Sequence, residues 1–147
     1  MPFKHSIRLK EFDYSSDGAY FITICTFQKA KIINPAYEII LKRELRSLEK
    51  RFAGVKIDFF VLMPNHCHII FIFRNAQTRL SAVVQAFKSI TTLQIKKADF
   101  YGAQFWQKNY YERVVRNDES LNCIREYVKL NPEKERINFD ELTYDEW

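Results

Sequence analysis

Residues 60–73 of the chain read FVLMPNHCHIIFIF. Two runs rich in aromatic and aliphatic residues flank a Pro-Asn pair at positions 64 and 65, which is typical of a tight turn between strands. The stretch therefore predicts a β-hairpin, with one strand over residues 55–63 and the next over residues 66–74.

The segments on either side of this hairpin predict one further strand and one helix each. Upstream, AYFITICTF at residues 19–27 has the composition of a strand, and the Asn-Pro pair at 34 and 35 caps a helix that ends at Gly54. Downstream, apolar residues at helical spacing predict a helix over residues 78–98, and residues 109–115 predict a fourth strand. The positions expected on the buried sides of the two helices are Ile39, Ile40, Leu45, Leu48 and Phe52 in the first, and Leu80, Val83, Val84, Phe87, Ile90 and Leu93 in the second.

A last helix is predicted to begin at Asn117 or Asp118 and to stop at Pro132. The resulting order of strand, helix, hairpin, helix and strand predicts a ferredoxin-like α+β sandwich, a four-stranded antiparallel sheet with two helices on one face. The other face is left for a ligand or for the last helix. No linker or repeat divides the chain, so we expect residues 1–147 to form one domain, with an acidic tail over residues 133–147.

Composition excludes several classes of protein. The chain has 147 residues, of which 47% are hydrophobic, and only 3 Gly and 4 Pro, which excludes a disordered or collagen-like chain. No apolar run approaches the roughly 18 residues needed to cross a bilayer, and the N-terminus shows no secretory signal. The 3 cysteines lie far apart and form neither a metal-binding nor a disulfide pattern, so we expect a cytoplasmic protein.

The net charge of +5 is unevenly distributed. Residues 133–147 hold 6 acidic and 2 basic residues, which leaves 12 acidic and 21 basic residues in positions 1–132. A basic body with an acidic tail favours a polyanionic partner, most simply nucleic acid. The alternative is a basic surface that only contacts solvent.

Two histidines start the second strand of the hairpin. Because side chains alternate across a strand, His66 and His68 share one face and Cys67 points to the other. We assign the helix-covered face to Cys67, Ile69, Phe71 and Phe73. The two imidazoles on the open face are two ligands of a candidate metal site, which needs a third. The alternative is a pair of histidines that only cap a strand in solvent.

The last helix offers that third ligand. Tyr127 and Asn131 are four residues apart and so lie on the same side of the helix, at the edge of its apolar stripe of Leu121, Ile124 and Val128. If the helix lies across the open sheet face, Asn131 approaches the imidazoles and Tyr127 stands one turn away. The alternative is an ordinary boundary tyrosine and an ordinary helix end before proline.

The sequence resembles a known family at these positions. Residues 60–73 resemble the histidine–hydrophobic–histidine (HUH) motif of single-tyrosine transposases, including the MPNH lead-in. Residues 105–132, FWQKNYYERVVRNDESLNCIREYVKLNP, resemble the second signature of the REP-associated tyrosine transposases, and DYSSDGAYFITICTF at residues 13–27 resembles their first strand. Cys67 departs mildly from the family, in which a bulkier aliphatic residue is usual.

The resemblance implies cleavage and rejoining of single-stranded DNA at hairpin-forming repeats, in transposition or mobilisation of a repeat element. The tyrosine of the Y-x-x-x-N-P ending, Tyr127, would be the nucleophile and would form a 5′-phosphotyrosine link. His66, His68 and Asn131 would hold a divalent ion, Mg²⁺ or Mn²⁺, on the scissile phosphate.

Other residues are candidates for contacts with the DNA. Tyr14 or Phe12 could stack on bases, and the candidate phosphate contacts are Lys88, Lys108, Arg113 and Arg116. Tyr110 and Tyr111 are rival nucleophiles, and in a strand they would point to opposite faces.

Two other functions stay open at this point. The same fold supports non-catalytic nucleic-acid-binding modules, and a domesticated relative would bind repeats without cutting them. Relatives of this kind act either as monomers or as homodimers that exchange the tyrosine helix, and the sequence does not decide between these states.

Overall fold

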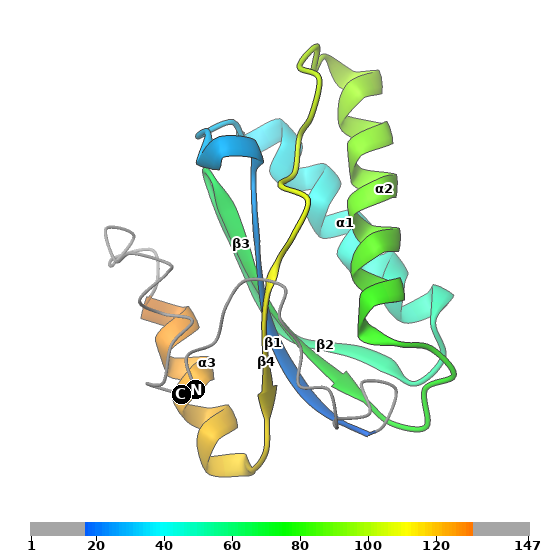
Figure 1. Cartoon of the computed structure of the whole chain (residues 1–147), viewed down its shortest axis with the longest axis vertical. Coiled ribbons are helices and arrows are strands. Elements are labelled where there is room, and N and C mark those ends of the chain that lie inside the picture. Colours follow the sequence, from blue (N-terminus) through cyan, green and yellow to red (C-terminus); the bar gives the residue numbers. More distant parts are fainter. Residues whose placement is uncertain (1–16, 131–147) are drawn as a thin grey trace.

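The computed structural model of the chain describes residues 17–130 and has the predicted order of elements (Figure 1). In chain order the elements are β1 (Gly18–Cys25), the 3₁₀ turn η1 (Phe27–Lys29), α1 (Pro35–Arg51), β2 (Val55–Met63), β3 (His66–Phe73), α2 (Leu80–Ala98), β4 (Tyr111–Val115) and α3 (Asp118–Leu130). The first strand ends at Cys25, earlier than predicted, because the chain turns at η1. The fourth begins at Tyr111, two residues later than predicted.

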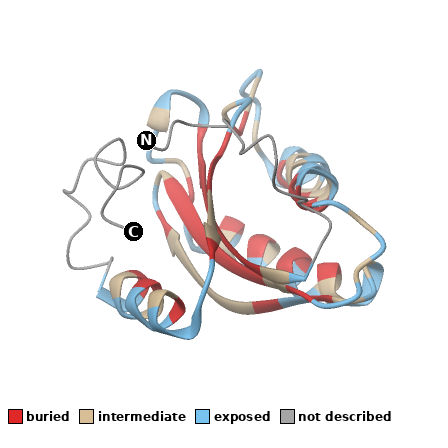
Figure 2. Cartoon of the chain, turned by 60° about the horizontal axis from the view of Figure 1, so that its bottom comes forward, coloured by how far each residue is buried: buried red, intermediate tan, exposed pale blue. Residues whose placement is uncertain are grey.

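The four strands form one antiparallel sheet in the order β2-β3-β1-β4. This is the strand order of a ferredoxin-like α+β sandwich, so the predicted fold is confirmed. Helices α1 and α2 lie on one face of the sheet, and α3 lies apart from them against the opposite face (Figures 1 and 2). None of the helices within residues 17–130 is long and apolar enough to span a membrane.

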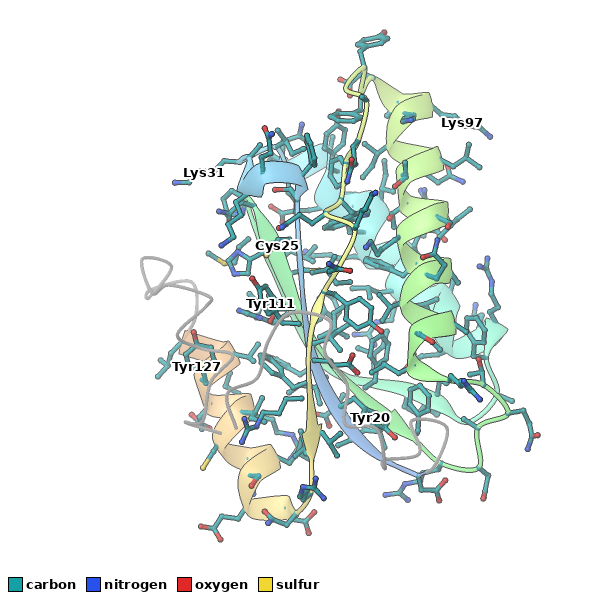
Figure 3. The ribbon with its side chains drawn as sticks, in the orientation of Figure 1. Tyr20, Cys25, Lys31, Lys97, Tyr111 and Tyr127 are labelled. Carbon is teal, nitrogen blue, oxygen red and sulfur yellow. The ribbon has the colours of Figure 1, made fainter. Side chains whose placement is uncertain are left out.

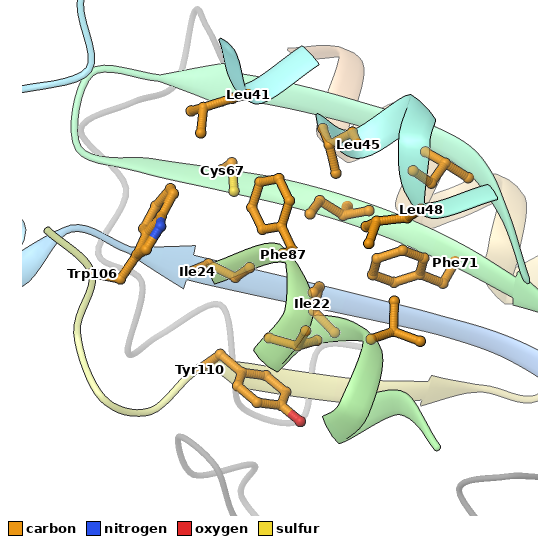
Figure 4. Close-up of a cluster of buried hydrophobic side chains, with 14 of the residues drawn as sticks. Ile22, Ile24, Leu41, Leu45, Leu48, Cys67, Phe71, Phe87, Trp106 and Tyr110 are labelled. Carbon is orange, nitrogen blue, oxygen red and sulfur yellow. The ribbon is translucent and has the colours of Figure 1, made fainter. Parts of the chain in front are cut away.

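The main core lies between the sheet and helices α1 and α2 (Figure 4). Side chains from β1 and β3 meet side chains from both helices there, and Cys67, Phe71 and Phe87 are fully buried. The predicted face of β3 is confirmed, since the residues of that strand in this core are Cys67, Ile69, Phe71 and Phe73. Alternation along the strand therefore sends the two histidines to the other face.

A second, smaller cluster lies between the sheet and α3. Ala19, Phe21, Ile70 and Val115 of the sheet contact the predicted stripe of α3, which consists of Leu121, Ile124 and Val128. The open face of the sheet is thus covered by the last helix, one of the two alternatives that the sequence left. The partly buried side chains that pack against this cluster are Phe59, Val61, Ile72 and Tyr127.

Both predicted N-caps are present. The Asn34 side chain accepts a hydrogen bond from the Tyr37 backbone N–H at 2.9 Å, and the Asn117 side chain accepts one from Ser120 N–H at 2.7 Å. The predicted stripes are wrong at one position in each of α1 and α2: Ile39 is 65% exposed and Leu93 is 49% exposed.

The cause is the phase of each helix. In α1 the buried positions are Tyr37, Leu41, Glu44, Leu45 and Leu48, and in α2 they are Leu80, Val83, Val84, Phe87, Thr91 and Ile95. Steps of three and four residues keep these positions on one side, and Leu93 lies six residues after Phe87, on the far side.

Candidate active site

His66 and His68 lie side by side on the α3 face of β3. Their ring centroids are 4.8 Å apart, and both side chains are almost completely buried. Phe21 of β1 stacks on the His68 ring, with centroids 5.3 Å apart and an interplanar angle of 28°. The pair is therefore held on a packed strand, which fixes the positions of the two rings.

A threonine on the neighbouring strand orients His68. Thr23 of β1 is the direct cross-strand partner of His68, and its Oγ1 lies 2.8 Å from His68 Nδ1 in a buried hydrogen bond. Burial, and then the proximity of His66, lower the pKa of His68 well below its usual value. His68 is therefore a neutral imidazole, the form that binds metal ions.

The turn residue Asn65 orients His66. The Asn65 amide nitrogen donates to the Lys29 carbonyl at 3.4 Å, which turns the amide oxygen toward His66. That oxygen lies 2.8 Å from His66 Nδ1, and because it can only accept, His66 Nδ1 carries the proton. In the neutral His66 ring the lone pair would then be on Nε2, a nitrogen ligand of the kind that divalent metal ions accept.

The remaining predicted ligand, Asn131, lies outside the described residues. Within residues 17–130, no three His, Cys, Asp or Glu side chains gather into a metal-binding group. Among residues 17–130 the candidate site therefore offers two oriented imidazoles.

Tyr127 lies on α3 (Figure 3), and its ring is next to that of His68. Its ring centroid lies 6.2 Å from that of His68 with an interplanar angle of 68°, and the side chain is half-buried at the border of the α3 cluster. The helix thus brings the predicted tyrosine next to the predicted histidines, although the two segments are some 60 residues apart in sequence.

The two rival tyrosines lie on opposite faces, as predicted. Tyr110 is part of the main core, on the side of α1 and α2. Tyr111 is the cross-strand partner of Thr23, so it lies on the same face as His68, in a buried position. Tyr111 is therefore the rival that an experiment must separate from Tyr127.

The candidate DNA contacts are not all near the histidines. Tyr14 and Phe12 lie outside the described residues. Arg113 is the cross-strand partner of Phe21, on the histidine face, and Arg116 is exposed just after β4.

Lys88 and Lys108 instead line a groove of about 570 Å³ between α2 and the segment that leads to β4. The Lys88 ammonium donates to the backbone carbonyls of Gln107 and Lys108, at 2.6 Å and 2.8 Å. The sheet separates this groove from the two histidines.

Sequence reasoning missed the residues that orient the site. Thr23 is a hydroxyl within the apolar AYFITICTF strand, and this interruption was an available indication. Asn65 is predicted as a turn residue and as part of the MPNH lead-in, and its contact with His66 is not predicted. An ion pair between Asp58 of β2 and Arg125 of α3 joins segments 67 positions apart, and nothing in the sequence pattern pointed to it.

The chain is similar to known proteins in sequence and in fold. The family model described as "Transposase IS200 like" matches residues 14–131. A curated protein of Haemophilus influenzae (strain Rd) is 32% identical over 160 aligned positions, covers 88% of both chains and is uncharacterised. A second protein of that strain, named provisionally as a REP-associated tyrosine transposase, is 23% identical and covers 83% of this chain and 74% of its own.

Two solved structures have the same fold. The structure of a REP-associated tyrosine transposase bound to a REP hairpin superposes with a TM-score of 0.72 at 18% identity, covering 88% of this chain and 74% of that one. A crystal structure from Deinococcus radiodurans, described provisionally as that of a transposase, gives a TM-score of 0.58 at 16% identity, covering 84% of this chain and 95% of that one.

Proposed function

The chain belongs to the family of IS200-like transposases, and on that premise we propose that it cleaves and rejoins single-stranded DNA through Tyr127. The observation that carries the proposal is the position of the Tyr127 ring, 6.2 Å from the His68 ring, beside a pair of buried imidazoles. A tyrosine next to two oriented metal-binding side chains has the components of phosphoryl transfer to a phenol.

The proposed reaction exchanges one phosphoester for another. The Tyr127 Oη attacks the scissile phosphorus, a bond from phosphorus to the tyrosine oxygen forms, and the bond to the 3′-oxygen breaks. The phenol gives up its proton, and the released 3′-oxygen takes one up. The products are a 5′-phosphotyrosine link and a free 3′-hydroxyl, and attack by another 3′-hydroxyl reverses the step and rejoins strands.

A tyrosine needs help as a nucleophile, because its pKa is about 10 in water. His66, His68 and Asn131 would hold Mg²⁺ or Mn²⁺, which when bound supplies Lewis-acid stabilisation of charge on the phosphate oxygens. The chain's own part is to orient the imidazoles through Thr23 and Asn65 and to keep His68 neutral.

We propose a hairpin-forming repeat as the DNA substrate. Support comes from the relative of similar fold that was solved bound to a REP hairpin, and from the basic character of residues 1–132. Arg113 lies on the face that carries the histidines, and Arg116 lies just beyond the end of β4. These two cations would contact DNA phosphates near the site, and Lys108 would do so on the far side of the sheet.

The arrangement within one chain supports a site that needs no second subunit. Tyr127 lies next to His68 of the same chain, so a monomer would be sufficient for the attack. Mixing a Tyr127→Phe chain with a chain that lacks both histidines tests this, because only a site shared between subunits would regain activity in the mixture.

The experiment that tests the function is capture of the covalent intermediate. A labelled single-stranded hairpin substrate is incubated with the protein and Mn²⁺, and the products are separated under denaturing conditions. We expect a denaturant-resistant protein–DNA adduct. Tyr127→Phe should abolish the adduct and leave hairpin binding intact.

Tyr111→Phe is the matched control, since it removes the other phenol on the same face of the sheet. We expect this variant to form the adduct. An adduct that persists in Tyr127→Phe and disappears in Tyr111→Phe would move the nucleophile to β4. Hairpin binding without any adduct in the native chain would favour a non-catalytic binding module.

A further inference from the structure

An ion pair fastens α3 to the edge of the sheet. The Arg125 guanidinium donates two hydrogen bonds to the Asp58 carboxylate, from Nε to Oδ2 at 2.8 Å and from Nη2 to Oδ1 at 2.7 Å. The side chains are 37% and 19% exposed, so the pair is partly shielded from water. This bidentate geometry constrains the orientation of the Arg125 guanidinium relative to the Asp58 carboxylate, as well as the distance between them.

A β-bulge places Asp58 in this position. Along β2, Ile57 pairs with Phe71 and Phe59 pairs with Ile70, so Asp58 is an extra residue in the ladder. Without the bulge, Ile57 and Phe59 would share one face. Instead Ile57 belongs to the main core and Phe59 to the α3 cluster, and Asp58 reaches α3.

The apolar contact under α3 has no preferred direction of its own. Leu121, Ile124 and Val128 pack on the sheet, and a directional contact beside them would restrict rotation of the helix about its axis. Arg125 and Tyr127 are two residues apart, or about 200° around the helix axis, and therefore flank the stripe on opposite sides. The ion pair of Arg125 with Asp58 would therefore oppose a rotation of α3 about its axis that moves Tyr127.

We propose that Asp58 and Arg125 are positioning residues for Tyr127, holding α3 at the rotation that keeps the tyrosine beside His68. The inference rests on the proposed role of Tyr127 as the nucleophile. A roll of about 20° would move a side-chain tip by about 2 Å, given a helix radius of about 6 Å with side chains. Misplacement by about 1 Å lowers rates by as much as about 100-fold in well-aligned sites.

The test compares two variants that each remove one positive charge from α3. Arg125→Gln breaks the link to the sheet, and Lys129→Gln breaks only the pair that Lys129 makes with Glu126 of the same helix, at 3.8 Å. We expect Arg125→Gln to lower the rate of adduct formation at saturating hairpin DNA by about 10- to 100-fold, as misplacement predicts. Lys129→Gln should form the adduct within about twofold of the native rate, because an exposed ion pair contributes little.

Two further variants separate positioning from charge and from folding. Arg125→Lys keeps the positive charge and loses the bidentate geometry, so this variant should also form the adduct more slowly than the native chain. The exchange Asp58→Arg with Arg125→Asp restores a pair of opposite sign, and it should recover part of the rate that either single change loses. Thermal unfolding of each variant shows whether it folds. Where a variant does not fold, Asp58→Asn is used instead, since it removes the charge of the same ion pair from the other partner.

A direct structural measurement keeps the inference independent of activity. The nuclear Overhauser effect between the ring protons of Tyr127 and His68 should be visible in the native chain and in Lys129→Gln, and should weaken in Arg125→Gln. Native-like ring contacts and an unchanged adduct rate in Arg125→Gln would overturn the inference. Failure of the native chain to form an adduct would instead refute the proposed function. The Overhauser effect between Tyr127 and His68 would then still test whether the Asp58–Arg125 pair positions Tyr127.

Discussion

Thr23 Oγ1 lies 2.8 Å from His68 Nδ1, across the ladder between β1 and β3. The hydroxyl gives a directional contact to a buried ring that also packs against Phe21, His66 and Tyr127. Groups of this kind behind a metal-binding histidine set the direction of its other nitrogen. The contact therefore gives a first prediction about metal affinity.

Thr23→Val removes the hydroxyl and keeps the shape of the side chain. We expect the variant to bind Mn²⁺ about 10- to 100-fold more weakly, the usual cost of losing such an orienting group. Calorimetric titration with Mn²⁺ measures the affinity directly. Thr23→Ser retains the hydroxyl and should bind nearly as well as the native chain, whereas equal binding by the valine variant would contradict the orienting role.

Removal of metal separates cutting from binding. Incubation with excess EDTA should abolish adduct formation, because the phosphate then loses its charge-stabilising ligand, and hairpin affinity should change little. Gel-shift and adduct assays on the same samples measure the two quantities. An adduct that forms equally well in EDTA would contradict the proposed metal dependence, and addition of Mn²⁺ back to the samples is the control.

Lys88 has a structural role that the sequence did not indicate. Its ammonium holds two carbonyls of the segment before β4, at 2.6 Å and 2.8 Å, and partial burial lowers its pKa. We expect Lys88→Met to lower the free energy of unfolding by about 1–3 kcal/mol, because two carbonyls lose a charged donor. Urea unfolding measures this, and an unchanged midpoint would contradict it.

Lys108 is the matched control in the same groove, with its own side chain exposed. Lys108→Gln should leave unfolding unchanged. If Lys108 contacts DNA, its loss should reduce the slope of log affinity against log salt by about 1. Measuring hairpin affinity at several salt concentrations decides between a phosphate contact and a solvated charge.

The hydrogen bond from Tyr37 to Asp99 predicts a pH dependence of stability. The Tyr37 hydroxyl donates to Asp99 Oδ1 at 2.5 Å, and this bond, with burial and the carboxylate charge, raises the pKa of Tyr37 to about 12. An unfolded tyrosine has a pKa of about 10, so the unfolded chain loses this proton first. Stability should therefore fall as the pH rises from about 10 toward 12.

Tyr37→Phe removes this contribution. We expect the difference in unfolding free energy between the native chain and the variant to be constant below pH 10 and to shrink above it. Urea unfolding of both proteins at pH 8, 10 and 11 measures the difference. A difference that stays constant to pH 11 would show that the hydroxyl does not hold its proton as described.

Local patterns were sufficient for most of the fold. The Pro-Asn turn inside FVLMPNHCHIIFIF predicts the hairpin, and alternation along the strand puts Cys67 in the main core and the histidines opposite. The buried side of each helix was predicted with one error. Ile39 and Leu93 are exposed, because their positions around the helix axis point them away from the sheet. The Asn34 and Asn117 caps were predictable, because a cap involves only its own turn.

The candidate site also has a part that the sequence predicted and a part that it did not. The sequence predicted which side chains form the candidate site, His66, His68 and Tyr127, since motif and spacing are properties of neighbouring residues. How these side chains are held became visible in the tertiary structure, where Thr23 contacts His68 across 45 positions and Asp58 contacts Arg125 across 67. Those contacts depend on strand register, on a bulge and on the rotation of a packed helix, which arise from the folding of the whole chain and leave no periodic trace in its sequence.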